Sequence, residues 1–300
     1  MTDIADRLRT RVRGRVLDNE PLGPLTTFRV GGAADVFVEA ETQDDLAAVG
    51  ELANDGVPVA IVGRGSNLLV SDAGFRGIAL KLGRGFRTHD QTDDGLRLGG
   101  AAYLPAAARL TARLGLTGFE FAAEIPATFG GAVRMNAGAH DRCIADVLIA
   151  ASVVDLADGS QRRVPATELG YAYRHSDLGP LDVVVGGELA LAAGDSEAIG
   201  KRIGAYLEWR RTHQPPGRSA GSVFVNPPDV AAGRLIDEAG AKGMRVGGAE
   251  VSTVHANFIV ASADAKAADV WTLIWRVQDM VARHSGVTLQ PEVRFLGAFS

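Results

Sequence analysis

The chain has 300 residues, of which 46% are hydrophobic and 22% charged, the values of an ordinary globular protein with room for two or three domains. Its 31 basic and 36 acidic residues give a formal net charge of −5. This balance argues against a protein that binds nucleic acid or an anionic membrane, because such proteins present a basic face.

The N-terminal segment, residues 1–10, is charged and lacks the apolar core of a signal peptide. No apolar run approaches the roughly 18 residues of a membrane span. We therefore expect a cytoplasmic protein. The single cysteine, Cys143, excludes an intrachain disulfide, and the six histidines do not cluster at ligand spacing, so we expect no metal site.

The first 82 residues are expected to form one lobe built on a β-α-β unit. In the helix, Thr42 and Asp45 resemble a capping box and Gly56 is a stop signal. The second strand opens into a glycine loop, and short strands follow around a turn. The predicted strand, helix, strand and strand pair cover residues 34–40, 42–56, 57–62 and 68–82.

A second lobe is expected over residues 83–211. Ala157-Asp158-Gly159 is a hairpin signal between two strand-like runs, and Ile199, Ile203 and Leu207 line one face of the last helix. The predicted helix, hairpin, buried strand and helix cover residues 101–114, 147–164, 182–191 and 196–211.

Pro215, Pro216 and Gly217 form the best linker candidate, and a third lobe is expected over residues 212–300. Trp271 and Trp275 have the i, i+4 spacing of a buried helix face. The predicted helix, strand, helix and strand cover residues 230–239, 256–261, 264–284 and 287–296, an order typical of an α+β lobe.

Two segments rich in small residues are candidates for phosphate binding. The first, residues 63–67, follows a strand and offers backbone N–H groups together with hydroxyl and amide side chains. The second, residues 118–140, is nearly uncharged and contains Gly130-Gly131, where the backbone can approach a bound molecule closely. Each segment also fits an ordinary tight turn. Two such loops could clamp one dinucleotide, although neither has Rossmann or Walker spacing.

Three polar residues outside these loops are candidates for chemistry. Ser222 lies beside Gly221 but not in a nucleophile elbow, so a local backbone hydrogen bond is the simpler role. Glu292 stands among apolar residues and needs a partner, for which Arg294 is one candidate. Arg174 follows two tyrosines that could hold its guanidinium over a carboxylate, and it could equally be a surface arginine packed on tyrosine.

Together these segments resemble the UDP-N-acetylenolpyruvoylglucosamine reductase family of flavoenzymes. The resemblance extends in order over almost the whole chain and is specific as a combination. It is carried by residues 27–32, 63–69, 118–140, 173–176, 220–227, 255–258 and 291–297.

The resemblance implies an α+β fold of the vanillyl-alcohol-oxidase type, with two lobes that bind FAD and a third that covers a UDP-sugar substrate. It implies that Ser222 is the proton donor and that Arg174 and Glu292 polarise the substrate carboxylate. The substrate-binding positions it implies are Tyr173, His213, Arg218, Asn226 and Asn257. The implied sites of noncovalent FAD binding are Gly63, Arg64, Gly65, Ser66, Asn67, Leu68, Gly118, Ile125, Pro126, Thr128, Gly130, Gly131, Asn136, Gly138 and Ala139.

The chain departs from the family pattern at His213, where many members carry a lysine. Histidine is only partly charged near pH 7, so phosphate or NADPH contacts could pass to Arg210, Arg211 or Arg218. The short interval from Arg174 to Ser222 resembles the subfamily that lacks a tyrosine-bearing loop.

The implied reaction uses NADPH to reduce FAD and then reduces an enolpyruvyl group. Glu292 would either be protonated and donate a hydrogen bond itself, or it would act through Arg174 or through a water. One alternative is an FAD oxidase of the same fold acting on an alcohol or hydroxy acid. Many such oxidases attach flavin covalently to histidine or cysteine; His140 and Cys143 are nearby, but nothing in the sequence marks either as an attachment site. Another is a flavin-binding redox sensor without catalysis, against which the joint presence of Ser222, Arg174 and Glu292 counts. A monomer is expected.

Overall fold

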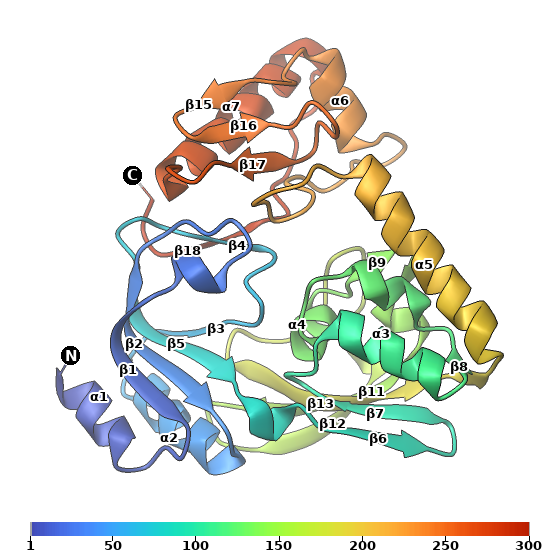
Figure 1. The fold of residues 1–300 in the computed structure, drawn as a ribbon. Coiled ribbons are helices and arrows are strands. Elements are labelled where there is room, and N and C mark those ends of the chain that lie inside the picture. The colour runs from blue at the N-terminus through green and yellow to red at the C-terminus, as the bar shows by residue number, and fades with distance from the viewer. Residues whose placement is uncertain (1, 300) are drawn as a thin grey trace. The chain divides into compact units, whose positions relative to one another are not determined.

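A computed structural model describes residues 2–299 (Figure 1). They divide into two units. Unit 1 comprises residues 2–18, 36–64 and 77–210, and unit 2 comprises residues 19–35, 65–76 and 211–299. The mixed α+β class is confirmed. The predicted lobe boundaries at residues 82 and 211 stay predictions.

A four-stranded sheet has the order β1 (Arg15–Pro21), β2 (Ala33–Ala40), β5 (Phe75–Leu82) and β3 (Val59–Ile61). Strands β2 and β3 of the predicted β-α-β unit are separated by β5, which pairs in parallel with β3. The sequence analysis missed β1, whose residues are largely polar and exposed.

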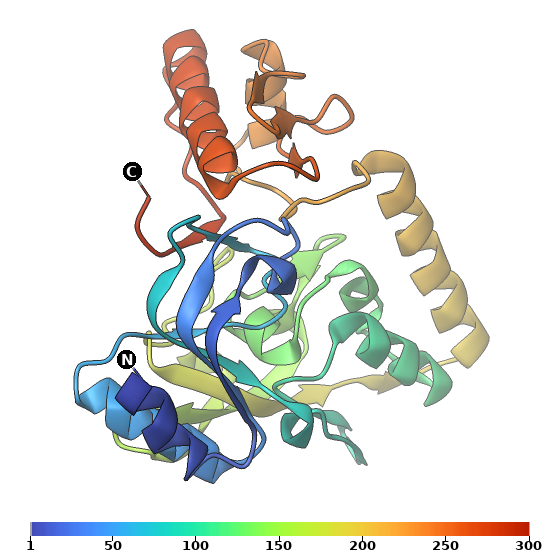
Figure 2. The ribbon, with the colours of Figure 1, turned by 60° about the vertical axis from the view of Figure 1, so that its left-hand side comes forward.

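Helix α2 (Gln43–Asn54) begins as predicted. The Thr42 hydroxyl accepts from the Asp45 N–H, and the Asp45 carboxylate accepts from the Thr42 N–H, so the capping box is confirmed. Leu46, Val49 and Leu52 of α2 are buried and share a core with α1 (Thr2–Arg9). Figure 2 shows the two blue helices side by side.

The second sheet of unit 1 is antiparallel. Its order is β12 (Gln161–Pro165), β11 (Leu148–Asp155), β13 (Asp182–Ala190), β7 (Gly95–Gly99) and β6 (His89–Thr92). The predicted hairpin is β11–β12 and the predicted buried strand is β13, whereas β6 and β7 were missed.

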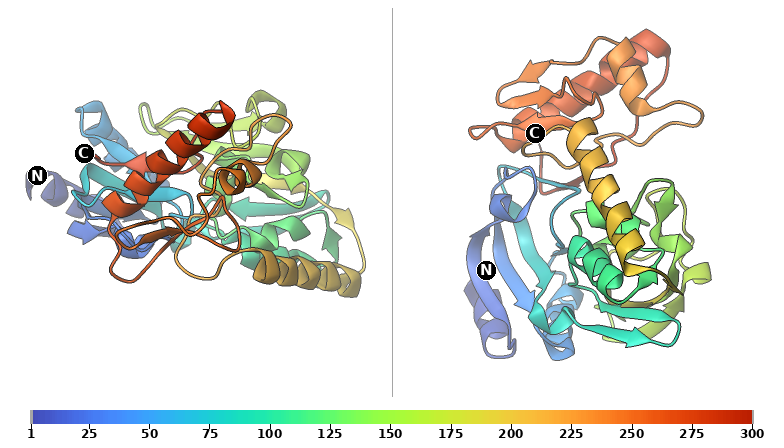
Figure 3. Two further views of the ribbon diagram at one scale, coloured as in Figure 1. Left: turned by 90° about the horizontal axis from the view of Figure 1, so that it is seen from above. Right: turned by 45° about the vertical axis from the view of Figure 1, so that its right-hand side comes forward.

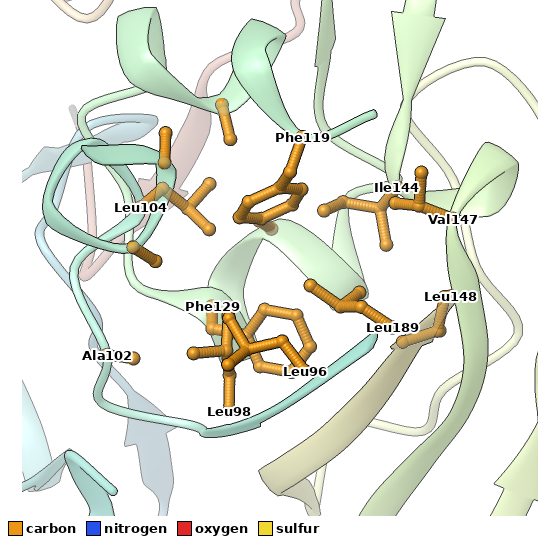
Figure 4. Close-up of a cluster of buried hydrophobic side chains, with 14 of the residues drawn as sticks. Leu96, Leu98, Ala102, Leu104, Phe119, Phe129, Ile144, Val147, Leu148 and Leu189 are labelled. Carbon is orange, nitrogen blue, oxygen red and sulfur yellow. The ribbon is translucent and has the colours of Figure 1, made fainter. Parts of the chain in front are cut away.

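Helices α3 (Leu104–Arg113) and α4 (Phe129–Arg134) complete the core of this part of unit 1. Leu104, Phe119, Phe129 and Leu189 are fully buried there and point toward one another (Figure 4). Short pairs of strands lie at β8 (Leu116–Thr117) with β14 (Ala192–Ala193), and at β9 (Gly138–Ala139) with β10 (Arg142–Cys143).

Helix α5 (Ser196–His213) lies alongside α3 in Figure 3. Ile199 and Ile203 are buried as predicted, but the prediction for Leu207 is wrong, since 38% of its surface is exposed. The neighbouring residue, Tyr206, packs inward instead of Leu207 and stacks on the ring of His140. The inward face of α5 therefore shifts by one residue near its C-terminal end.

Unit 2 contains an antiparallel sheet of β15 (Arg245–Val246), β16 (Ala249–Val251) and β17 (Ile259–Ala261), with helices α6 (Ala232–Glu238) and α7 (Ala267–Ser285). A parallel pair joins β4 (Leu68–Val70) to β18 (Arg294–Leu296). The prediction of a strand over 287–296 is wrong except at β18, because residues 290–292 bond instead to residues 223–225. Strands β15 and β16 were missed.

The buried face of α7 consists of Ala267, Val270, Leu273, Ile274, Val277 and Val281. The prediction that Trp271 and Trp275 form this face is wrong, because both are half-buried at its edge, with ring centroids 6.1 Å apart. Among residues 2–299, no helix is long and apolar enough to cross a membrane.

Candidate functional site

The two predicted glycine loops meet in unit 1. A Cβ atom on Gly63 would lie 2.8 Å from Oγ1 of Thr128, the residue that caps α4 by accepting from the Gly131 N–H. Tyr103 forms a β-bridge with Thr128, and the Arg64 guanidinium lies 5.1 Å from the centroid of the Tyr103 ring. Residues from both candidate segments therefore share one neighbourhood.

Only some of the glycines in these loops leave room for a ligand. A Cβ on Gly130 would lie 2.7 Å from the Val184 carbonyl oxygen, and a Cβ on Gly65, whose φ is +60°, would lie 2.6 Å from the Leu25 carbonyl oxygen. Both glycines are required by the protein's own packing. A Cβ on Gly131 would meet only Thr128 Oγ1, at 3.3 Å. Gly131 thus differs from Gly65 and Gly130, because an added Cβ there would meet one side-chain oxygen and no backbone atom of the surrounding protein.

The later part of the second loop is held by side-chain amides and by β9. The Asn136 amide donates to the Ala172 carbonyl over 3.1 Å and accepts from the Ala145 N–H over 3.0 Å. Gly138 and Ala139 form β9 itself. These bonds explain why Asn136, with a φ of 41°, is buried in a left-handed conformation.

Arg174 is tied to this loop. Its guanidinium donates to the Gly138 carbonyl over 3.1 Å and lies 4.8 Å from the centroid of the Tyr173 ring. One of the two predicted aromatic contacts is therefore present. Tyr171 is largely buried instead, and burial, with a smaller contribution from Cys143, raises the pKa of its hydroxyl. The φ of Arg174 is 55°, a strained conformation of the kind found at functional sites.

A cluster around His140 was missed by the sequence analysis. The His140 ring stacks on Tyr206 with centroids 3.8 Å apart, meets Trp209 edge-on at 5.3 Å, and places Nε2 2.9 Å from Oε2 of the buried Glu124. The i, i+3 spacing of Tyr206 and Trp209 on α5 was the available signal. These contacts show that the His140 ring packs against α5 and the buried Glu124 side chain.

In unit 2, the segment with Ser222 is fixed by Asn257. Ser222 forms a β-bridge with Phe258, and the Val223 N–H donates to the Asn257 carbonyl over 2.8 Å. The buried Asn257 side chain accepts from the Phe224 N–H over 2.9 Å and donates to the Phe224 carbonyl over 2.8 Å. Its amide thus takes the place of a strand partner.

Glu292 lies on the neighbouring segment of unit 2. Its N–H donates to the Val223 carbonyl over 2.7 Å, next to Ser222. The Asn67 side chain donates to the Glu292 carbonyl over 3.0 Å. The segments that carry the predicted catalytic residues Ser222 and Glu292 are therefore paired through their backbones.

The other predicted substrate residues also make internal contacts. The Asn226 side chain accepts from the Ala232 N–H at the start of α6 over 2.9 Å. His213 ends α5, with Nδ1 2.8 Å from the Thr212 hydroxyl. Of the arginines considered in place of the missing lysine, Arg210 donates to the Glu124 carbonyl and Arg218 to the Ser262 carbonyl.

The site offers no ligand set for a metal. Within residues 2–299, no three side chains of His, Cys, Asp or Glu are grouped so that they could hold an ion.

Two family models match the chain: an FAD binding domain over residues 34–165 and the C-terminal domain of UDP-N-acetylenolpyruvoylglucosamine reductase over residues 212–296. A protein from Heliobacterium modesticaldum named UDP-N-acetylenolpyruvoylglucosamine reductase is 44% identical over 289 residues, which cover 95% of this chain and 92% of that protein. A protein of the same name from Synechococcus is 45% identical, with 93% of each chain covered.

Among solved structures, UDP-N-acetylenolpyruvylglucosamine reductase from Thermus caldophilus has a TM-score of 0.82 at 38% identity, covering 95% of this chain and 99% of that chain. BBE-like 1 from Physcomitrella patens has a TM-score of 0.60 at 12% identity, covering 96% and 90%, and shares the fold alone. The predicted FAD-binding fold of the vanillyl-alcohol-oxidase type is confirmed. The chain belongs to the UDP-N-acetylenolpyruvoylglucosamine reductase family.

Proposed function

We propose that this chain is an NADPH-dependent flavoenzyme of peptidoglycan synthesis, which reduces the enolpyruvyl group of UDP-N-acetylglucosamine enolpyruvate to give UDP-N-acetylmuramate. The observation that carries the proposal is the hydrogen bond from the Glu292 N–H to the Val223 carbonyl. This bond joins the segment that carries Ser222 to the segment that carries Glu292 within unit 2, in a chain of this family, and so supports the assignment of both residues to one reaction.

A bound FAD would supply the hydride chemistry, with NADPH as the hydride source and the β-carbon of the enolpyruvyl group as the acceptor. We assign its binding to the loops around Gly63, Arg64 and Gly131, because these residues lie together and the backbone at Gly131 is open to approach. The attachment is noncovalent, because His140, the ring considered for attachment, is engaged with Tyr206 and lies against Glu124.

Arg174 stabilises the negative charge that reduction places on the substrate α-carbon and carboxylate. A fixed cation is most effective where charge develops, because it needs no reorganisation during the reaction. The Gly138 carbonyl and the Tyr173 ring hold the Arg174 guanidinium in place before substrate arrives. Glu292 is the second member of this polarising pair.

Ser222 donates the proton that completes the reduction at the α-carbon. A serine hydroxyl is a weak acid in water, so the site must stabilise its conjugate base transiently. The Asn257 and Glu292 contacts fix the backbone on which Ser222 stands. This rigidity holds the hydroxyl in one orientation for proton transfer.

The proposal also covers the substrate-binding residues, the oligomeric state and the location of the enzyme. The UDP-sugar is bound with contributions from Tyr173, His213, Arg218, Asn226 and Asn257. The enzyme acts as a monomer in the cytoplasm, without a nucleic-acid or membrane partner.

Anaerobic mixing tests the proposed function directly. The purified protein should be yellow, NADPH should bleach it, and the enolpyruvyl sugar nucleotide should then restore the colour. Denaturation should release the colour from the chain. Colour that stays with the denatured chain, or bleached protein that only oxygen reoxidises, would instead support an oxidase of the same fold.

A further inference from the structure

Asn67 belongs to the first glycine loop, but its side chain contacts the segment that carries Glu292. The Asn67 Nδ2 group donates to the Glu292 carbonyl over 3.0 Å, and the Arg294 N–H donates to the Asn67 carbonyl over 3.0 Å. One residue of the loop thus engages two residues of the C-terminal segment, all within unit 2.

The bond from the Asn67 side chain lies beyond the end of the β4–β18 pairing and reaches Glu292, which that pairing does not include. Strands β4 and β18 pair from Leu68 with Arg294 onward, so Glu292 lies two residues before the first pair. The preceding residue, Pro291, has no N–H with which to fix this stretch. The Glu292 peptide is therefore held from two directions, through its N–H by the Val223 carbonyl and through its carbonyl by Asn67.

We infer that Asn67 is a positioning residue, whose side chain orients Glu292 for the reduction of substrate. The inference rests on the proposed function and adds to it a residue that acts through Glu292. An error of about 1 Å in the placement of a reacting group can cost about 100-fold in rate. A single hydrogen bond at the Glu292 peptide is thus sufficient to affect the reaction.

The test compares Asn67→Ala with the matched control Ser71→Ala in the flavin-loaded enzyme. Ser71 follows the opposite end of β4 from Asn67, and its hydroxyl donates to the Ala298 carbonyl on the same C-terminal segment, away from Glu292. Stopped-flow absorbance measures flavin reduction by NADPH and reoxidation by the enolpyruvyl substrate separately. Asn67→Ala should slow reoxidation by about 10- to 100-fold in enzyme kept saturated with FAD, and the reduction rate reports separately on the implied FAD contact of Asn67. Ser71→Ala should change neither rate by more than about twofold.

A double-mutant cycle with Glu292→Gln identifies the residue through which Asn67 acts. If Asn67 works by orienting the Glu292 carboxyl group, Asn67→Ala should slow reoxidation little further in the Glu292→Gln background. Hydrogen–deuterium exchange supplies a readout that does not depend on activity. The peptide covering residues 286–296 should exchange faster in Asn67→Ala than in Ser71→Ala.

Normal reoxidation by the FAD-saturated variant, or additive effects in the cycle, would each overturn the inference. Failure of the wild-type enzyme to be reoxidised by the sugar nucleotide would instead overturn the proposed function. In that case the exchange comparison still decides whether Asn67 fixes the Glu292 segment. Equal exchange in the two variants would show that it does not.

Discussion

The neighbourhoods of Arg174 and Ser222 are built in different ways. Around Arg174 in unit 1, four non-glycine residues adopt left-handed backbone conformations, with φ between 41° and 57°; they are Asn136, His140, Asp141 and Arg174. Around Ser222 and Glu292 in unit 2, extended segments are joined by backbone hydrogen bonds and by the side-chain amides of Asn67 and Asn257.

This difference shows two routes to a fixed site. In unit 1 an unusual backbone brings the Gly138 carbonyl to the Arg174 guanidinium, at the cost of conformational strain. In the unit 2 segments around Ser222 and Glu292, the left-handed residue beside Ser222 is a glycine, Gly221, and asparagine amides complete a pairing that a regular strand would supply. We therefore expect unit 1 to be sensitive to changes of backbone and shape, and unit 2 to the loss of single polar groups.

The largest expected effect concerns Ser222, where one oxygen atom carries the proposed chemistry. Ser222→Ala should leave FAD content and reduction by NADPH nearly unchanged, because the proton is needed only after hydride transfer. Reoxidation by the enolpyruvyl substrate should slow by about 10²- to 10⁴-fold. Stopped-flow absorbance of the flavin measures both steps.

Ser222→Cys is the matched variant for this comparison, because a thiol can still deliver a proton. It should retain more reoxidation activity than Ser222→Ala. Normal turnover of the alanine variant would move the proton donor elsewhere, and loss of flavin would make the Ser222 segment structural.

Arg174→Lys tests whether shape matters in unit 1 when charge is kept. Lysine lacks the planar fork of arginine and cannot contact the Gly138 carbonyl and a substrate carboxylate in the same geometry. Reoxidation by substrate should fall by about 100-fold, while reduction by NADPH remains within about threefold. Near-normal turnover would identify Arg174 as an ordinary surface residue.

Gly131→Val tests the open backbone at the second glycine loop. The added side chain would occupy the space through which a cofactor approaches, so the ratio of flavin to protein absorbance should fall in the purified variant. Gly200→Val is the control, because Gly200 lies on α5 with no atom within 4 Å of an added Cβ. Full FAD retention in a folded Gly131→Val protein would remove this loop from the cofactor site.

The smallest effect on catalysis is expected at Asp45, which caps α2 away from the candidate residues. Burial acts to raise the pKa of Asp45, but hydrogen bonds from Glu41, Arg13, Thr42 and Gly14 outweigh it and the pKa lies below its usual value. Asp45→Asn should lower the free energy of unfolding by about 2 kcal/mol at pH 7.

The sign of the pH dependence follows from this lowered pKa. The stabilisation by Asp45 is present above the unfolded-state pKa of about 3.9 and is lost as pH falls through the lower folded-state value. Denaturant unfolding should therefore show a gap between wild type and variant that narrows below about pH 4. A gap that is constant with pH would contradict the role of the charged form, and flavin reduction rates should be equal at pH 7.

The sequence by itself determined the elements whose signals are local. The capping box at Thr42, the turn at residues 157–159 and the apolar spacing of α5 all rely on neighbours within a few positions. The small residues of the second glycine loop likewise marked a place for close approach, and one of them, Gly131, is open. The motifs as a set also indicated the family, because their order along the chain is specific.

Only the tertiary structure decided which polar groups meet. Asn67 and Glu292 are 225 positions apart, and no local pattern shows that the amide of one bonds the carbonyl of the other. The same holds for Asn257 and Phe224, for His140 with Tyr206, and for the shift of the buried face that exposes Leu207. A hydrogen bond depends on distance and direction in three dimensions, whereas sequence patterns report mainly on burial and local backbone preference.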